Sequence, residues 1–241
     1  MALALASFFA AVFGFSIVRG GVCTLAAIEE LILESKWKRL QGFAELWVWI
    51  GAFFLIAHFG FGIEFTKSSY ETTLATLLGG FFLAFGAFIN QACPFGTIAA
   101  IGSGYWSYLA TPIGLLAGSF VHVRHLSFLS PHTSPLYSPL LTLSPLVLIP
   151  IVAWLAWRCA PSVSRHVRSR DIGLIIRNAW NPVFASVVVA ASFCALALLV
   201  GPWSYTQLLA DLASGRCELL YERLVLLMAM FGGAITGGLT D

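Results

Sequence analysis

Charged residues are scarce in this sequence. They make up only 10% of the 241 residues, whereas 59% are hydrophobic and the mean hydropathy is +0.89. A soluble domain has about 25% charged residues, so this composition excludes an ordinary soluble domain and predicts the lipid bilayer as the solvent. The formal net charge of +2 is too small to indicate nucleic-acid binding. The sequence thus predicts an all-α integral membrane protein, a polytopic helical bundle with a single membrane domain over residues 1–241.

Two kinds of motif are also lacking. No basic residue precedes the first apolar run, Leu3–Val18, so this run does not have the positive region of a secretory signal and is expected to remain as a helix. The five cysteines show neither the spacing of zinc ligands nor a disulfide framework. We therefore expect free thiols, and no residue pattern indicates a metal or a cofactor.

Long apolar runs are what the sequence does contain. A membrane-spanning helix needs about 20 largely apolar residues, so this chain has room for roughly seven to nine of them. The candidate spans are Leu3–Val18, Phe43–Phe61, Leu74–Ile89, Leu109–Val123, Leu136–Trp157, Val183–Val200 and Leu224–Leu239. Two further apolar pieces, Gly20–Leu33 and Ala92–Gly104, have only about 13–14 residues each, which is the length of re-entrant or broken helices. We therefore look for functional residues in these two short pieces.

The basic residues indicate how the chain is oriented. Lys36, Lys38 and Arg39 fill one loop, and five further arginines lie between residues 158 and 177. An excess of Lys and Arg marks the cytoplasmic side of a membrane protein. Both loops fall on that side only if each short piece enters and leaves on the same side, which places the N-terminus outside. The external segment 124–145, rich in proline and histidine, is assigned no role.

The chain contains a candidate internal repeat. The pair Phe13-Gly14, followed by Cys23 and the string Thr-Leu-Ala-Ala-Ile, recurs about 72 residues later as Phe85-Gly86, followed by Cys93 and Thr-Ile-Ala-Ala-Ile. Each unit is predicted to be a helix, a cysteine-bearing re-entrant half-helix and a second helix. Repeat 1 spans about 1–61 and repeat 2 about 74–123, and the remaining helices lie in 136–241. Because each unit crosses the membrane twice, the copies are expected to be parallel; chance recurrence of small apolar residues is the alternative.

The second half-helix has the features of an anion site. Pro94 directly follows Cys93, and proline is favoured at the first position of a helix, so Cys93 is predicted to cap a half-helix that begins at Pro94. The free N–H groups of such a first turn attract anions and lower the pKa of a cysteine placed there. Gly96 permits close approach of a ligand to the backbone, and Thr97 supplies a hydroxyl.

Neighbouring polar residues complete the candidate binding set. Asn90 and Gln91 precede Cys93 in an apolar stretch, so their amides are expected to face protein or a polar path rather than lipid. In the first copy, Arg19 and two glycines lead into Cys23 and Thr24. Arg19 either adds positive charge at an entrance or extends to the membrane interface.

The remaining polar and aromatic residues have ordinary explanations. The other cysteines, Cys159, Cys194 and Cys217, are expected to act as small hydrophobic residues. Glu45, in the second span, is either functional or reaches water. Trp203 and the tryptophans near other span ends are interpreted as interfacial anchors.

Taken together, the segments Arg19–Thr24, Gln91–Thr97 and Gly102–Trp106 resemble the YeeE/YedE family of sulfur-compound transporters. The resemblance implies a multi-pass protein of the bacterial inner membrane that imports thiosulfate or a related inorganic sulfur anion and is not an enzyme. Cys23 and Cys93 match the family's cysteines, whose S–H groups contact the passing anion. It also implies delivery to a cytoplasmic sulfur-carrier protein of the TusA kind.

One departure from the family leaves three hypotheses. Full-length members consist of two related halves, whereas this sequence stops soon after Phe231-Gly232. A second half-transporter chain, or a homo-oligomer, is therefore a candidate partner. The leading hypothesis is a permease. The alternatives are a membrane sulfurtransferase that forms a persulfide on Cys93, and a truncated half-transporter that functions only as a subunit.

Overall fold

A computed structural model of the chain describes residues 2–63, 69–70, 73–126, 133–134, 149–158, 180–201, 203–216 and 220–240. The helices are α1 (Ala2–Gly20), α2 (Thr24–Glu34), α3 (Lys38–Phe61), α4 (Leu74–Asn90), α5 (Pro94–Gly102), the 3-10 helix η1 (Trp106–Leu109), α6 (Ala110–His125), α10 (Pro182–Val200), α11 (Tyr205–Ala213) and α12 (Leu220–Leu239). A short helix, Ile149–Arg158, lies between α6 and α10 along the chain. Apart from one antiparallel pair of two-residue strands, β1 (Ser69–Tyr70) and β2 (Thr133–Ser134), these elements are helical, and the all-α class is confirmed.

Five helical stretches in the described residues are long and apolar enough to cross a membrane. They are Ala2–Glu34, Lys38–Phe61, Leu74–Gly102, Pro182–Val200 and Leu220–Leu239, and they contain five of the seven predicted spans. Of the other two, Leu109–Val123 forms η1 and the 16-residue α6, whose last turn carries His122, Arg124 and His125. The span Leu136–Trp157 is described only from residue 149 onward. The protein is thus a multi-pass membrane protein, with fewer long helices in its described part than the seven to nine expected.

Local sequence signals set the helix boundaries. Pro182 begins α10, and the side chain of Asn181 accepts a hydrogen bond from the backbone N–H of Val183 at 3.0 Å, which caps the helix. Thr73 and Thr76 form a capping box at the start of α4. Gly62 ends α3 in a left-handed conformation, with φ at 64°.

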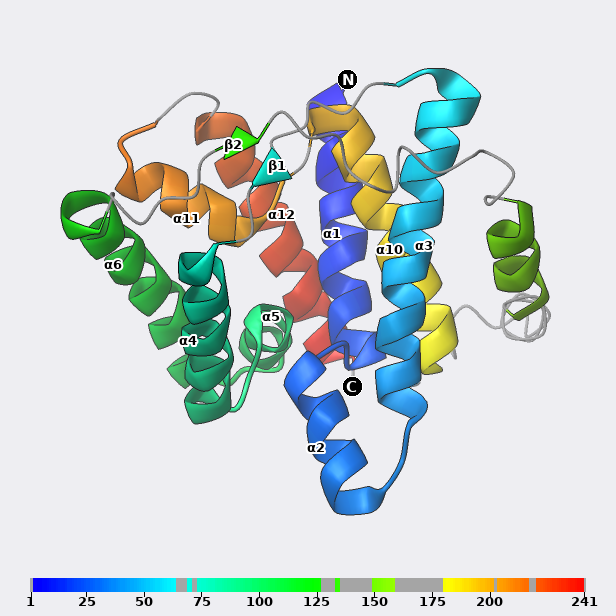
Figure 1. The fold of residues 1–241 in the computed structure, drawn as a ribbon, viewed down its shortest axis with the longest axis horizontal. Helices are drawn as coiled ribbons and strands as arrows, with labels where there is room; N and C mark the ends of the chain where they lie inside the picture. Colours follow the sequence, from blue (N-terminus) through cyan, green and yellow to red (C-terminus); the bar gives the residue numbers. More distant parts are fainter. Residues whose placement is uncertain are drawn as a thin grey trace.

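The helices alternate in direction along one axis (Figure 1). α1 runs away from the N-terminus, α3 returns, α4 repeats the direction of α1, and α6 repeats that of α3. The groups α1–α3 and α4–α6 therefore each contain a long helix, a short helix after a break, and a helix that returns. This order is the one that parallel repeats require, while the repeat itself and the re-entry of α2 and α5 into a membrane stay predictions.

The described residues that flank the second basic segment, Arg158 and Trp180, lie near the end of the bundle where α3 begins. Arg158 donates a hydrogen bond to Glu45 near the start of α3, at 3.0 Å, and the backbone N–H of Trp180 donates to the carbonyl of Arg19 at the end of α1, also at 3.0 Å. These contacts place Arg158 beside α3 and Trp180 beside the end of α1. The prediction that both basic segments face one side of the membrane stays a prediction. The hydrogen bond from Arg158 also shows that Glu45 is paired rather than extended into water, since Glu45 is only 2% exposed.

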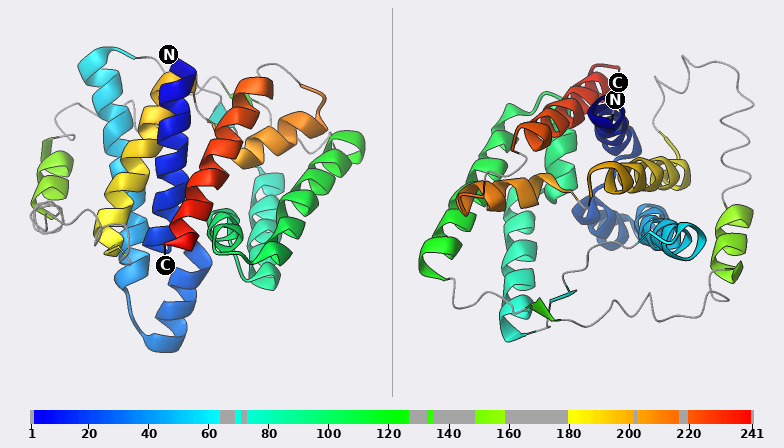
Figure 2. Two further views of the ribbon diagram at one scale, coloured as in Figure 1. Left: turned by 180° about the vertical axis from the view of Figure 1, so that it is seen from behind. Right: turned by 90° about the horizontal axis from the view of Figure 1, so that it is seen from above.

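The core surrounds α1, which lies between α10 and α12 (Figure 2). Small residues bring α1 and α12 into backbone contact. A Cβ atom added to Gly14 would overlap the carbonyl group of Met230, and one added to Gly233 would overlap the carbonyl group of Ala11. α5 packs on α12 in the same way, because a Cβ on Gly102 would lie 2.6 Å from the Ala234 carbonyl oxygen.

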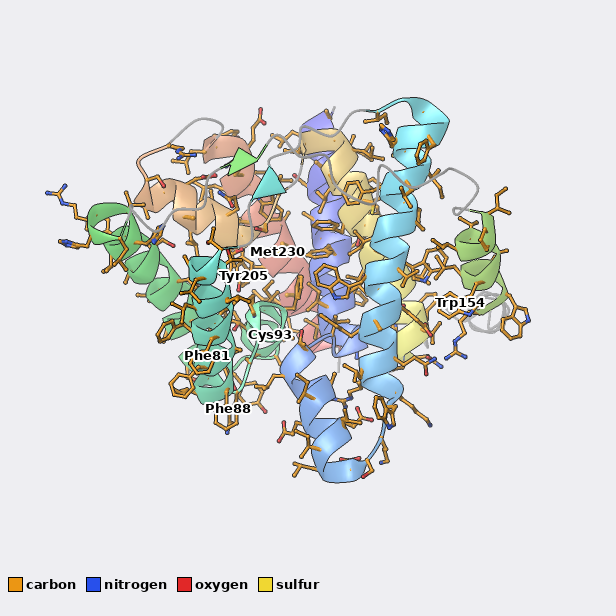
Figure 3. The ribbon with its side chains drawn as sticks, in the orientation of Figure 1. Phe81, Phe88, Cys93, Trp154, Tyr205 and Met230 are labelled. Carbon is orange, nitrogen blue, oxygen red and sulfur yellow. The ribbon has the colours of Figure 1, made fainter. Side chains whose placement is uncertain are left out.

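In contrast to α1, helix α4 lies at the outside of the bundle. None of its residues is buried, and its large apolar side chains are exposed, including Phe81 at 64% and Phe88 at 68%. Figure 3 shows both phenylalanines pointing away from the other helices. An apolar surface of this kind is suited to lipid or to another protein chain.

Candidate functional site

The two cysteine-bearing breaks are built alike. α1 ends at Gly20, Gly21 has φ at +54°, and Cys23 is the extended N-cap residue of α2. α4 ends at Asn90, Gln91 also has φ at +54°, and Cys93 is the extended N-cap residue of α5. The left-handed residue ends the preceding helix in each copy, so that a new helix can begin in another direction. The predicted cap at Cys93, with proline at the first helical position, is confirmed.

The two breaks come together at Gly96, although they are far apart in the sequence. The backbone N–H of Gly96 donates to the Cys93 sulfur at 3.4 Å. A Cβ atom added to Gly96 would lie only 2.6 Å from the Cys23 sulfur and 3.3 Å from its Cβ. The two thiols are close enough to interact with each other. A side chain at position 96 would displace the Cys23 sulfur, so glycine permits this approach.

Backbone donors converge on the same sulfur pair. Besides Gly96, the backbone N–H groups of Thr24 and Phe95 lie close enough to the Cys93 sulfur to interact with it. These donors belong to the first turns of α2 and α5, so the positive ends of both helices meet at the cysteines. The hydroxyl oxygen of Thr97 is buried there in α5 and has no hydrogen-bond partner among the described residues. The arrangement combines soft S–H groups with the donors of an anion site.

Tyr205, on α11, is a site residue that the sequence reasoning missed. Its hydroxyl donates a hydrogen bond to the carbonyl of Pro94 at 3.0 Å, and its side chain is 6% exposed (Figure 3). The bond fixes the first turn of α5 beside Cys93. No local motif marks this tyrosine, because α11 is a nine-residue helix that was not expected.

Asn90 and Gln91 do not join the sulfur pair through any hydrogen bond of the described residues. The Asn90 amide donates to the carbonyl of Ala92 at 3.3 Å and accepts from the Thr111 hydroxyl at 3.1 Å, so it ties the α4–α5 turn to α6. Gln91 is exposed and lines an apolar groove with Leu25 of α2. The Asn90 amide thus faces protein, as expected, whereas Gln91 borders an apolar groove rather than a polar path, and their role in binding substrate stays a prediction.

Arg19 lies inside the bundle, at the end of α1, rather than extended from its surface. Its residue is only 3% exposed, so the side chain does not extend to the outer surface. The guanidinium donates to the Thr240 hydroxyl at 2.6 Å and lies 5.9 Å from the ring of Phe15. Arg19 therefore ties the end of α1 to the end of α12, while still lining a pocket beside the Gly20–Gly21 turn.

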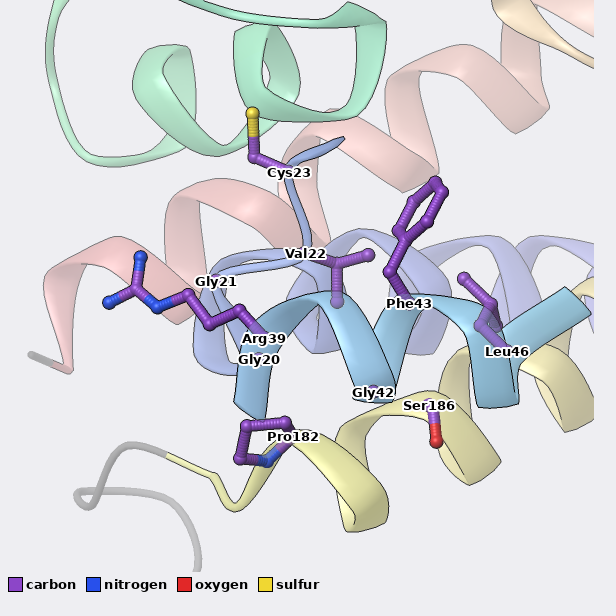
Figure 4. A pocket seen from close by; sticks show the side chains of 10 residues that line it. All are labelled: Gly20, Gly21, Val22, Cys23, Arg39, Gly42, Phe43, Leu46, Pro182 and Ser186. Atoms are coloured by element: carbon purple, nitrogen blue, oxygen red, sulfur yellow. The ribbon is translucent and has the colours of Figure 1, made fainter. Parts of the chain in front are cut away.

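Below the Cys23 turn lies a small cavity of about 20 Å³, lined by residues of α1, α3 and α10 (Figure 4). This volume holds about one water molecule. The Cys23 side chain points away from the turn toward the α4–α5 segment, and the Arg39 side chain lies beside Gly21. Among the described residues, no group of three or more His, Cys, Asp or Glu side chains is arranged to hold a metal ion.

The comparisons with known proteins agree with this chemistry. A family model described as sulphur transport matches residues 19–235, a range that contains both cysteines, Gly96 and Tyr205. No curated protein matches the chain. The resemblance inferred from the two cysteine motifs is thereby confirmed over nearly the whole sequence.

Proposed function

This chain belongs to the sulphur-transport family, and on that premise we propose that it is a permease for thiosulfate or a related inorganic sulfur anion. The observation that supports this substrate class is the meeting of two helix N-termini at the sulfurs of Cys23 and Cys93. Helix N-termini attract an anion through their N–H groups, and thiols are soft, weak hydrogen-bond donors. A weak partner suits a transport site, because the ligand must leave as readily as it binds.

Passage requires the two short helices to separate. In this structure the thiols are close enough to interact with each other, and the neighbouring cavity of about 20 Å³ is too small for an oxyanion. We propose that the anion replaces the thiol–thiol interaction with S–H contacts to itself. The Thr97 hydroxyl, which has no partner in the described part of the chain, then supplies a further donor.

The basic end of the bundle supports an orientation in the membrane. Lys38 and Arg39 begin α3 at the end opposite the N-terminus (Figure 1). Placing that end in the cytoplasm puts the N-terminus outside the inner membrane. We propose import, with delivery to a cytoplasmic sulfur-carrier protein.

A second candidate function rests on the same proximity of the two thiols. A Cys93 thiolate that attacks the outer sulfur of thiosulfate would form a persulfide and release sulfite, and Cys23 would be the adjacent acceptor. The groups that interact with the Cys93 sulfur are backbone N–H groups and the Cys23 thiol, which supply no general base. A persulfide on Cys93 in mass spectra after exposure to thiosulfate favours this chemistry, and its absence during uptake favours the permease.

The exposed α4 supports a further proposal about partners. Its apolar residues, such as Phe81, are exposed, and none of its residues is buried against the other described helices. Lipid covers this surface if the chain acts alone, and a second copy or a second half-transporter chain covers it if the transporter is assembled from subunits.

The test is growth on thiosulfate as sole sulfur source, in cells that cannot otherwise import it. We expect growth with the wild-type chain and none with Cys23→Ala or Cys93→Ala. Cys194→Ala is the matched control, because Cys194 is a free, buried cysteine of α10 with the same 6% exposure as Cys93. Normal growth with Cys93→Ala would refute the proposed path, provided that membrane levels of the proteins are equal.

A further inference from the structure

Arg39 lies at the boundary of two pockets with opposite charge. One pocket, of about 340 Å³, is lined by Glu29, Glu30, Glu34 and Lys36 together with Arg39. The other, of about 290 Å³, is lined by Arg19, Arg39, the Gly20–Gly21 turn and Trp180, and none of its described lining residues carries a carboxylate. Arg39 is the residue that these two pockets share. We call the second one the arginine pocket.

The arginine pocket has the size and the chemistry to hold a small oxyanion. Its volume of about 290 Å³ far exceeds the roughly 10–15 Å³ that a cavity needs to hold one water molecule. Two guanidinium groups line it, and each presents planar N–H donors that match an oxyanion in a bidentate way. Arg19 donates a hydrogen bond to Thr240, which helps to hold that side chain in place beside the pocket.

The pocket adjoins the cysteine site directly. Gly20, Gly21 and Arg39 line both the arginine pocket and the small cavity under Cys23. An anion that leaves Cys23 on this side therefore meets Arg39 next. Figure 4 shows the Arg39 side chain beside that turn.

Glu30 holds Arg39 when no anion is present. The Arg39 Nε lies 2.9 Å from a carboxylate oxygen of Glu30, whose side chain is only 15% exposed, while the Arg39 side chain is 53% exposed. A half-exposed guanidinium is free to turn from one partner to another, and a divalent anion attracts it more strongly than a single carboxylate does.

We propose that the arginine pocket is a binding site for a divalent sulfur oxyanion on the basic side of Cys23, and that Glu30 competes with that anion for Arg39. The inference rests on the proposed function for its ligand class. Glu30 lowers the affinity of the pocket, so that the anion is released rather than retained. Arg39 is a binding residue here, and Glu30 is a positioning residue that acts through it.

The experiment measures the equilibrium binding of thiosulfate to the purified full chain, from the rise in its melting temperature with thiosulfate concentration. Arg39→Gln is expected to raise the apparent Kd about tenfold at low salt, because a cation next to a divalent anion is lost. Lys38→Gln is the matched control: it removes the same charge from the adjacent residue, which does not line either pocket. Arg39→Lys, which keeps the charge but not the planar fork, is expected to lie between wild type and Arg39→Gln.

The competition has its own variant and control. Glu30→Gln is expected to lower the apparent Kd several-fold, since Arg39 loses its internal partner. Glu34→Gln removes a carboxylate from the same helix, one that pairs with Lys36 at 2.7 Å instead, and is expected to leave the Kd unchanged. Equal Kd values for Arg39→Gln and Lys38→Gln, or an absence of thiosulfate binding to the wild-type chain, would overturn the inference.

Binding and transport are separable in this design. Arg39-dependent binding without thiosulfate uptake by reconstituted vesicles would support the arginine pocket and refute the permease. Uptake that needs both cysteines, together with binding that does not depend on Arg39, would support the permease and refute the pocket.

Discussion

Replacing Gly96 with alanine perturbs the contact between the two short helices most directly. The new methyl carbon would lie 2.6 Å from the Cys23 sulfur, 3.3 Å from the Cys23 Cβ and 3.4 Å from the Cβ of Ala92. Non-bonded atoms of this size pack at roughly 3.5 Å or more, so the Cys23 sulfur has to move by about 0.9 Å. Overpacking of a buried contact costs about 1–3 kcal/mol, and we expect a loss of stability in that range.

The same displacement is expected to impair transport more than stability. A misplacement of about 1 Å in a binding site reduces rates by up to about 100-fold. Thiosulfate uptake by Gly96→Ala should therefore fall strongly while the protein remains folded. The contact between the thiols should also weaken, which is measured as slower formation of a Cys23–Cys93 disulfide under a mild oxidant.

Two controls separate this steric effect from a general effect of alanine. Gly86→Ala alters a glycine of α4 that has no atom within 4 Å of an added Cβ, and it should leave uptake unchanged. The second control places Gly96→Ala in a Cys23→Ala background, where the sulfur is absent. The stability cost should then fall below about 1 kcal/mol, because the two residues are directly coupled. An equal cost in both backgrounds would refute the reasoning.

Two further variants test the supports of the site. Tyr205→Phe removes the hydrogen bond to the first turn of α5 and is expected to cost about 1–3 kcal/mol, because a buried carbonyl loses its partner; uptake should fall with it, as measured in reconstituted vesicles. Gly233→Ala forces a methyl group into the backbone of α1 and is expected to destabilise the protein by about 3 kcal/mol or more, as measured by thermal unfolding in detergent.

Each of these variants has a neighbouring control. Tyr221→Phe removes a hydroxyl from a side chain that is 74% exposed, and it should change neither stability nor uptake. Gly232→Ala adds a methyl group where no atom lies within 4 Å, so it should be tolerated. Melting temperatures that are the same for Gly232→Ala and Gly233→Ala would show that α1 and α12 do not pack as described.

The two helix breaks were predictable because their signals are local. Proline directly after Cys93 sets the first turn of α5, and the glycines before Cys23 permit the chain to turn at the end of α1. The family resemblance was likewise carried by residues close together in the sequence. For the same reason, most helix positions followed from apolar runs of sufficient length.

The contacts that complete the site were not predictable from the sequence, because they join distant segments. No local pattern indicates that Gly96 lies against both cysteine side chains, or that the Tyr205 hydroxyl donates a hydrogen bond to the carbonyl of Pro94. Trp203, interpreted as an interfacial anchor, is only 8% exposed and belongs to the core, so that interpretation is wrong. The burial of Trp203 depends on the adjacent helix α11, whose nine residues are too few for an apolar pattern to be recognised in the sequence.

Uptake of radiolabelled thiosulfate by vesicles that contain only this chain tests the central claim most directly. Wild-type protein and Cys194→Ala should accumulate the label, whereas Cys23→Ala and Cys93→Ala should not, with all four proteins folded and present in equal amounts. Uptake that survives the loss of both Cys23 and Cys93 would contradict a path between the two helix N-termini.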